Sequence, residues 1–151
     1  MMQSLIKGEH WYAVKDGNAS ARHLFGRHYS RHVYRDGRRP KLFVGPGEKM
    51  VLLTTDARAL FVWRLEKHRR DNRQGVNCAV FRNEGDIMSS ALILEAETLA
   101  WSRWQMDRVF TYINPRAIRS QNPGYCFKCA GWAICGETKV NRLLILEKAM
   151  R

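Results

Sequence analysis

The sequence contains no long apolar run, no internal repeat and no low-complexity tract. A membrane-spanning helix needs about 18 consecutive apolar residues or more, and no stretch of this chain approaches that length. The first residues, Met1 to Lys7, also lack the apolar centre of a secretory signal. We therefore expect a cytoplasmic protein that does not associate with membranes.

Cysteine is scarce, with four residues in a chain of 151, which argues against a disulfide scaffold. Cys126 and Cys129 form a Cys-x-x-Cys pair. No second pair follows at the spacing of a zinc ribbon, and the pair falls within a predicted helix. Cys78 and Cys135 stand alone. We expect reduced thiols and no metal site built from cysteine.

Acidic residues are also few, because 14 Asp and Glu stand against 26 Lys and Arg. The resulting net charge of +12 and pI of about 10.1 favour a polyanionic partner, most commonly nucleic acid. The excess is concentrated in the segment 20–41, where arginine and histidine alternate with aromatic residues. The residues predicted to contact DNA are Arg27, His28, Tyr29, Arg31, His32, Arg35, Arg38 and Arg39.

The histidines of this segment allow a second interpretation. His28 and His32 would share one face of a helix, and two imidazoles one turn apart can hold a transition metal. No cysteine ligand accompanies them in the segment. We predict no metal here and favour phosphate contact, with a metal as the alternative.

The remaining chain has a regular pattern of strands and helices, and its length suits a single domain, 1–151, with the basic segment 20–41 near its N-terminus. The pattern predicts strands at 50–54, 59–65, 75–82, 108–113 and 143–146, and helices at 90–104, 116–120 and 125–130. Ser89 or Ser90 is expected to cap the first of these helices. The order of the elements is typical of an α/β (α+β) protein with a mixed sheet.

The loop between the strand 75–82 and the following helix is a candidate phosphate site. A strand that leads into a helix N-terminus presents backbone amides and the positive end of the helix dipole. Gly85 lets the backbone bend closely, and Arg82 adds a positive charge. An ordinary strand-to-helix loop is the alternative. The candidate cofactor-binding residues are Arg82, Asn83, Gly85, Ser89 and Ser90.

Two motifs resemble the GCN5-related N-acetyltransferases (the GNAT family). Arg82-x-x-Gly85-x-Ile87 is similar to the motif with which these enzymes hold the pyrophosphate of acetyl-coenzyme A, with Ile87 in place of a small residue. The stretch 122–132, NPGYCFKCAGW, is similar to a second GNAT motif, with Phe127 in place of the tyrosine that often protonates the leaving thiolate. The resemblance covers roughly residues 50–147 and implies a GNAT acyltransferase-like fold and acetyl-CoA or a related acyl donor.

A narrower resemblance accounts for both this fold and the positive charge of the chain. The stretches FVGPGEKMVLLT, VNCAVFRNEG, SSALILEAE and TYINPRAIRSQNPGYCFKCAGW are similar to a phage-borne family related to Mom, which modifies the exocyclic amine of adenine in DNA and protects it from restriction. The resemblance implies a DNA-modifying transferase that acts on double-stranded DNA in the bacterial host cytoplasm. Tyr112, Asn114 and Tyr125 are its candidate catalytic residues.

Several alternatives stay open. The chain could be an acyl-CoA-dependent N-acetyltransferase acting on a protein or a small-molecule amine, or a DNA-binding module without catalysis. The face of the strand 108–113 on which Tyr112 lies is not fixed by the sequence. A homodimer is possible, because the basic segment could cover a neighbouring subunit.

Overall fold

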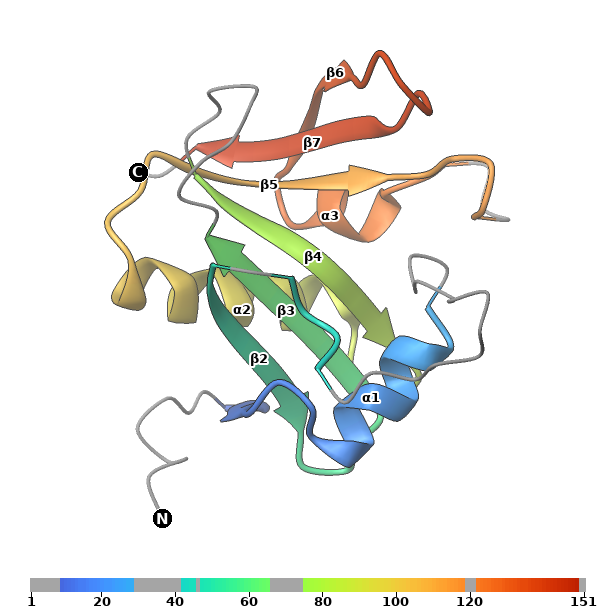
Figure 1. Cartoon of the computed structure of the whole chain (residues 1–151). Helices are drawn as coiled ribbons and strands as arrows, with labels where there is room; N and C mark the ends of the chain where they lie inside the picture. Colours follow the sequence, from blue (N-terminus) through green and yellow to red (C-terminus); the bar gives the residue numbers. More distant parts are fainter. Residues whose placement is uncertain (1–8, 29–41, 46, 66–74, 119–121, 150–151) are drawn as a thin grey trace.

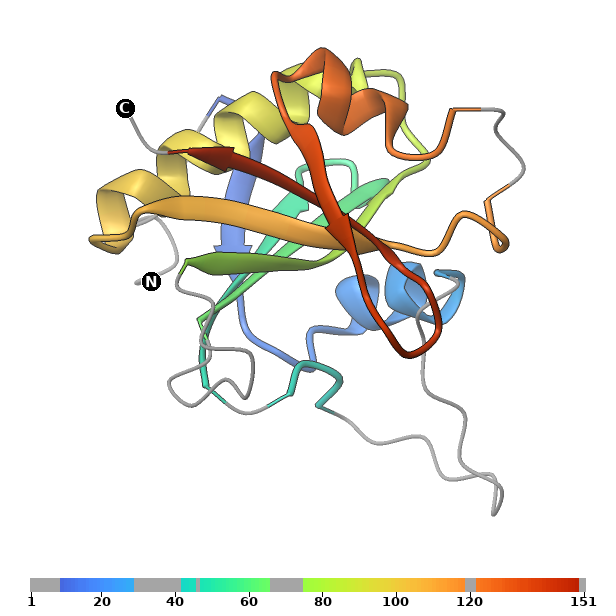
Figure 2. The ribbon, with the colours of Figure 1, turned by 90° about the horizontal axis from the view of Figure 1, so that it is seen from above.

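The computed structural model describes residues 9–28, 42–45, 47–65, 75–118 and 122–149. In these residues one seven-stranded sheet carries helices on both of its faces (Figures 1 and 2). The elements, in chain order, are β1 (Trp11–Val14), α1 (Ala19–Gly26), β2 (Glu48–Thr54), β3 (Ala59–Leu65), β4 (Val76–Asn83), α2 (Ser89–Arg103), β5 (Arg108–Ile113), α3 (Tyr125–Cys129), β6 (Ala133–Glu137) and β7 (Leu144–Ala149). None of the described helices has the length and apolar character needed to cross a bilayer.

The strand order is β1-β2-β3-β4-β5-β7-β6. Every neighbouring pair is antiparallel except β4 and β5, which run parallel and are joined through α2. A parallel pair needs such a crossover, whereas antiparallel neighbours can be joined by tight turns. The predicted mixed α/β sheet is therefore confirmed, and β3 and β5 have the bounds that the sequence predicts.

Each face of the sheet has its own apolar core. On one face, α2 buries Leu92, Ile93, Ala96 and Ala100 at helical spacing against the sheet. Trp63 lies completely buried under α2, and its Nε1 donates a hydrogen bond to the carbonyl of Ala96 (2.9 Å). On the other face, α1 packs against residues of β2, β3 and β4. The α2 face also carries α3, so the two helices lie on the same side (Figure 2).

A buried ion pair holds three elements together on the α2 face. Glu97 of α2 is 3% exposed, and its carboxylate lies 2.8 Å from Nζ of Lys148 in β7. The same carboxylate accepts a hydrogen bond from Trp132 Nε1 (2.9 Å), and Lys148 Nζ also donates to the carbonyl of Ala130 (2.9 Å). A buried carboxylate is costly unless it is paired and hydrogen-bonded. Glu97 meets both conditions and ties α2 to β7 and to the chain between α3 and β6.

The N-terminal part of the sheet was not predicted. β1 has only four residues, and its attachment depends on contacts with distant residues. Trp11 is buried and donates from Nε1 to the carbonyl of Leu92 (2.8 Å), while the Glu95 carboxylate accepts the backbone amides of His10 and Trp11. A strand this short leaves too little periodicity to detect.

Two other expectations are corrected. α2 begins at Ser89 with Met88 as its N-cap, and no side chain caps it, so the predicted serine cap is wrong. Within the predicted helix 116–120, residues 116–117 belong to a turn in which the Ala117 amide donates to the Asn114 carbonyl (3.1 Å). Residues 119 and 120 lie outside the described part of the chain. The strand at 143–146 and the helix at 125–130 are confirmed as β7 and α3, and β7 pairs with β6.

The Glu97 pair gives a prediction for stability. Glu97→Gln keeps an acceptor for Trp132 but leaves the Lys148 ammonium without its buried counter-charge, so we expect the free energy of unfolding to fall by about 3 kcal/mol. Urea denaturation followed by circular dichroism measures this loss. Asp107→Asn is the control, because this exposed carboxylate should change stability by less than about 0.5 kcal/mol. Equal stability of the two variants would contradict the role given to the pair.

Candidate functional site

The parallel strands β4 and β5 pair at only three positions and then part. Their register is Val76 with Val109, Asn77 with Phe110 and Cys78 with Thr111. At the last position, the Thr111 hydroxyl donates to the Cys78 carbonyl (2.9 Å) and so occupies an acceptor next to the end of the ladder. Beyond this position, β4 remains paired with β3 and β5 with β7, and β4 and β5 diverge from each other (Figure 1). We call the region between their C-terminal halves the strand gap.

A bulge and a histidine mark the β4 side of the strand gap. The pairing of β3 with β4 shifts so that Val62 faces Val80 while Trp63 faces Cys78, which leaves Ala79 as an extra residue. The amide of Glu84 donates to the carbonyl of Arg58 on the β3 side (2.7 Å). Because alternate residues of an antiparallel strand turn their backbone groups toward the same neighbour, Phe81 directs its backbone groups away from β3. The imidazole of His28, which follows α1, lies next to the Phe81 backbone.

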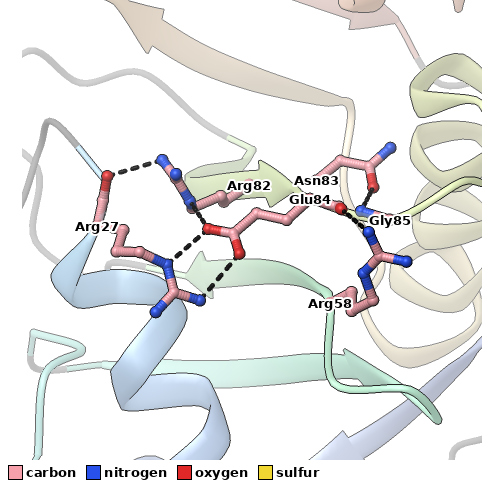
Figure 3. A network of polar contacts seen from close by, with 6 residues as sticks. All are labelled: Arg27, Arg58, Arg82, Asn83, Glu84 and Gly85. Carbon is pink, nitrogen blue, oxygen red and sulfur yellow. Dashed lines mark hydrogen bonds and ion pairs between the residues drawn. The ribbon is translucent and has the colours of Figure 1, made fainter.

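The chain that follows β4 is fixed in shape by one side chain. Asn83 Oδ1 accepts the Gly85 amide (2.9 Å), while its Nδ2 donates to the Ile87 carbonyl (2.7 Å) and to Ser89 Oγ (3.0 Å) (Figure 3 shows the Gly85 contact). Ile87 itself packs against the core of the α2 face. The loop between β4 and α2 therefore has a defined conformation. No side chain caps the amides in the first turn of α2.

Four charged side chains surround this loop (Figure 3). Glu84 accepts two hydrogen bonds from Arg27 (2.7 and 2.9 Å) and one from Arg82 (2.5 Å), and Arg82 also donates to the Arg27 carbonyl (2.7 Å). The two guanidinium groups lower the pKa of Glu84 to about 2. Arg58, from the loop between β2 and β3, donates to the Glu84 carbonyl (2.7 Å) and keeps a half-exposed side chain. The network connects the end of α1 to the start of the loop.

The predicted cofactor-binding residues occupy this region with different roles. Asn83, Gly85, Ser89 and Ser90 form the loop and the first turn of α2. The guanidinium of Arg82 lies instead with Glu84 and the Arg27 carbonyl, beside α1. Sequence reasoning missed Arg58, because nothing in a hairpin loop indicates that it meets a loop 26 residues further along the chain. Contact of these residues with a cofactor stays a prediction.

The predicted catalytic residues do not meet on one face. Val109 and Ile113 point into the core under α2, so Tyr112, which alternates with them, lies on the α1 face. Its ring contacts Phe110 edge to face at 5.7 Å. Asn114 follows β5, and its Oδ1 accepts the Arg116 amide (3.1 Å). Tyr125 begins α3 on the opposite face and is 60% exposed.

The residues of the second motif are mainly structural. Phe127 is buried and contacts the rings of Phe81 (5.9 Å) and Trp132 (4.8 Å). Its side chain therefore anchors α3 to β4. Cys126 and Cys129 lie in α3 as free thiols, and the Cys129 thiol next to Tyr125 raises the pKa of that phenol.

Among the residues predicted to bind DNA, Arg27 and His28 are in the described part of the chain. Arg27 forms the ion pair with Glu84. His28 is 8% exposed, and its burial next to Arg82 lowers its pKa to about 4, so the free protein does not present a cationic imidazole to solvent. The other six, Tyr29, Arg31, His32, Arg35, Arg38 and Arg39, lie outside the described residues. Their contact with DNA remains a prediction.

One group of side chains in the described part of the chain has ligand atoms close enough for a metal, namely Glu9, His10 and Glu95. It lies at the start of β1, whereas the strand gap is between β4 and β5. The Glu95 carboxylate already accepts the amides of His10 and Trp11 and contacts His10 Nδ1 (3.0 Å). Attachment of β1 to α2 accounts for this arrangement without an ion.

The architecture defines the class of the protein. A mixed sheet whose parallel pair parts beside a helix N-terminus is a GNAT-like fold. The chain is similar in structure to a protein from Sphaerobacter thermophilus DSM 20745 that is assigned as an acetyltransferase, with a TM-score of 0.51 and 11% sequence identity over 96% of this chain and 97% of that one. No protein family and no curated protein matches the sequence.

The Glu84 cluster gives a prediction for pH dependence. The pKa of Glu84 falls from an ordinary 4.5 to about 2 in the folded protein, so its stabilising effect is complete above pH 4.5 and is lost as the pH falls toward 2. We expect Glu84→Gln to be less stable than wild type at pH 6, with a difference that shrinks between pH 4.5 and pH 3. Thermal unfolding at several pH values measures it, with the exposed Glu137→Gln as control. A difference that is constant with pH would contradict the ionic role.

Proposed function

We propose that the protein is an N-acyltransferase that uses acetyl-CoA or a related acyl-CoA as donor. The observation that carries this proposal is the strand gap next to the uncapped N-terminus of α2. A helix N-terminus with unoccupied amides favours phosphate groups, through both its N–H donors and its dipole. The two features together suit a donor that has a diphosphate at one position and a reactive thioester several bonds away.

The charges around the loop agree with a phosphorylated donor. The first turn of α2 contains no acidic residue, and the exposed Asp86 carboxylate in the preceding loop lies 3.5 Å from Arg58 Nη1. Arg58 stands beside the loop with about half of its side chain exposed, and its guanidinium can approach a phosphate from the β2–β3 side. Ile87, which replaces the small residue of the GNAT motif, packs against the core of the α2 face.

The acceptor amine is proposed to approach from the α1 face. Tyr112 and His28 lie on this face, and residues 29–41 of the basic segment follow directly after His28. The segment ends where Phe43 stacks on Phe25 of α1 (4.9 Å between ring centroids). Both ends of the basic segment are thus held at α1, on the side opposite α2.

The proposed acceptor is the exocyclic amine of adenine in duplex DNA. Two observations support it: the net charge of +12 with its concentration in the segment 20–41, and the resemblance to the Mom-related family. An enzyme that modifies a base must hold phosphates and receive a base turned out of the stack. The arginines of the basic segment suit the first of these needs.

Donor binding can be tested without disturbing the fold. Ser90→Glu adds a negative charge to the first turn of α2, which favours the helix but repels a diphosphate. We expect the variant to fold at least as stably as wild type and to bind acetyl-CoA at least tenfold more weakly by isothermal titration calorimetry, about 1.4 kcal/mol. Ser90→Gln, which has the same shape without the charge, should bind within about threefold of wild type. Equal affinity of all three proteins would contradict a diphosphate at this position.

The proposed DNA acceptor is tested first by measuring the binding of duplex DNA. Affinity for duplex DNA should fall steeply as salt rises, because each phosphate contact releases counterions. Replacing Arg35 and Arg38 by alanine should weaken binding and flatten this dependence, whereas Arg103→Ala, at the C-terminus of α2, should not.

The product of the proposed reaction is a heavier deoxyadenosine. Mass spectrometry of nucleosides from bacteria that express the protein should detect it in the host DNA. Unchanged nucleosides in cells containing folded protein that binds acetyl-CoA would contradict the DNA acceptor and favour a protein or small-molecule amine.

A further inference from the structure

The hairpin formed by β6 and β7 ends in a loop that lies beside the C-terminal end of β5, one border of the strand gap. Residues 139–142 form the tip of this hairpin. Leu144, the first residue of β7, pairs with Ile113, the last residue of β5. The Arg116 guanidinium, in the chain that follows β5, donates to the Asn141 carbonyl. Figure 2 shows that the tip turns toward the side of the sheet on which α1 lies, which is the side proposed for the acceptor.

The tip exposes an apolar side chain between two cationic ones. Val140 is 75% exposed, the highest value for a large apolar residue in the described part of the chain. Lys139 precedes it, and Arg142, whose side chain is 79% exposed, follows two residues later. The Glu137 carboxylate lies 3.8 Å from Arg142 Nε, and such an exposed ion pair contributes little. The tip can therefore present both positive charge and an apolar group to a polyanion.

The backbone that carries Val140 has an unfavourable conformation. A single exposed apolar residue is common on a protein surface, but the next two residues, Asn141 and Arg142, have φ angles of 68° and 49°. Glycine is favoured at such positions of a hairpin and asparagine is tolerated, whereas arginine is disfavoured. A hairpin that only had to reverse the chain would be better served by glycine at position 142. Unfavourable backbone conformations of this kind are concentrated at functional sites.

The side chain of Thr138 fixes the shape of the tip. Its hydroxyl accepts the Leu143 amide (2.9 Å) and donates to the Val140 carbonyl (2.6 Å). The Thr138 amide donates to the Leu143 carbonyl (2.9 Å), which closes the loop at its base. Together with the bond from Arg116 to Asn141, these contacts hold the backbone on both sides of Val140. A group that is already fixed in place loses little conformational entropy when it binds.

We propose that the β6–β7 tip inserts Val140 into the base stack of duplex DNA, while Lys139 and Arg142 contact the flanking phosphates. This inference rests on the proposed DNA acceptor and adds the element that opens the duplex. An adenine can leave the stack only when its pairing and stacking are broken. An apolar side chain inserted between bases stabilises the opened duplex. Because the tip lies beside the end of β5, the displaced base would be released next to the strand gap.

Base opening can be measured without knowledge of the recognition sequence. Plasmid DNA offers many sequences, and permanganate oxidises thymines that have lost their stacking, such as the partner of a displaced adenine. We expect wild-type protein to make a subset of thymines reactive. Val140→Ser removes the apolar group, so we expect this reactivity to fall at least about fivefold, while affinity for a plasmid fragment stays within about threefold by filter binding.

The matched control for Val140→Ser is Ile134→Ser. Ile134 is also an exposed apolar residue of the hairpin, but it lies in β6, away from the tip. This variant should retain both the affinity for DNA and the thymine reactivity of wild type.

Arg142→Gly tests the phosphate contact separately from the fold. Glycine adopts the φ angle of position 142 readily, so the melting temperature should not fall below that of wild type. The affinity for the plasmid fragment should decrease, and the slope of log K against log salt should become shallower by about one contact. Circular dichroism and filter binding at several salt concentrations measure the two effects.

Each outcome bears on a different step. Val140→Ser that opens bases as well as wild type overturns the insertion and favours a protein partner at the tip. A Val140→Ser variant whose binding and base opening fall in parallel also overturns it, because the residue would then be a contact and not a wedge. An unchanged salt dependence of Arg142→Gly overturns the phosphate contact.

The wild-type protein separates this inference from the proposed function. Binding of plasmid DNA without any reactive thymine overturns base opening, and with it the role of the tip. A failure to bind plasmid DNA overturns the proposed DNA acceptor itself. None of these measurements uses the acyl donor, so a failure to bind acetyl-CoA would contradict the acyltransferase proposal alone.

Discussion

The early end of the β4–β5 ladder is the constraint on which the rest of the site depends. Each strand has a second partner: β3 pairs with β4 from Asn77 to Asn83 around the bulge at Ala79, and β7 pairs with β5 along its whole length. The sheet therefore tolerates the loss of pairing between them after Cys78 and Thr111. Backbone groups that would otherwise complete the ladder must find other partners. The Thr111 hydroxyl supplies one of these partners, because it donates to the Cys78 carbonyl.

The two faces of the sheet carry different parts of the proposed chemistry. On one face, Asn83 shapes the loop that leads into α2, and the buried pair of Glu97 and Lys148 holds α2, α3 and β7 in place. On the other, Glu84 connects Arg27 and Arg82, so the end of α1 is tied to the end of β4. The strand gap lies between these two supported regions. Such a frame suits the proposed group transfer, because it would fix the distance between the proposed donor and the proposed acceptor.

Much of the fold was predictable from the sequence, because long apolar strands and a broad apolar helix face have a clear period. The bounds of β3 and β5 and the position of α2 follow from such patterns. β1 could not be found, since its four residues are held by Trp11 and by distant contacts with α2. The serine cap of α2 was wrong because Asn83 takes Ser89 Oγ as an acceptor.

The site was predictable only in part. The strand-to-helix loop was located correctly, since glycine and a helix start are local signals. The division of Tyr112 and Tyr125 between opposite faces depends on strand phase and on the path of the chain through α3, which no local pattern fixes. Arg58 and the burial of His28 are products of tertiary contacts with β4 and its loop. The resemblance to GNAT enzymes predicted the fold correctly, whereas the hydrogen-bond partners of Arg82 could be identified only from the structure.

A crystal structure of the protein soaked with acetyl-CoA tests the central claim most directly. The account predicts density for the diphosphate against the amides at the start of α2, with the thioester between the C-terminal halves of β4 and β5 and within reach of the α1 face. Density for the ligand at another surface, or none at saturating concentration with the two strands still parted, would contradict it.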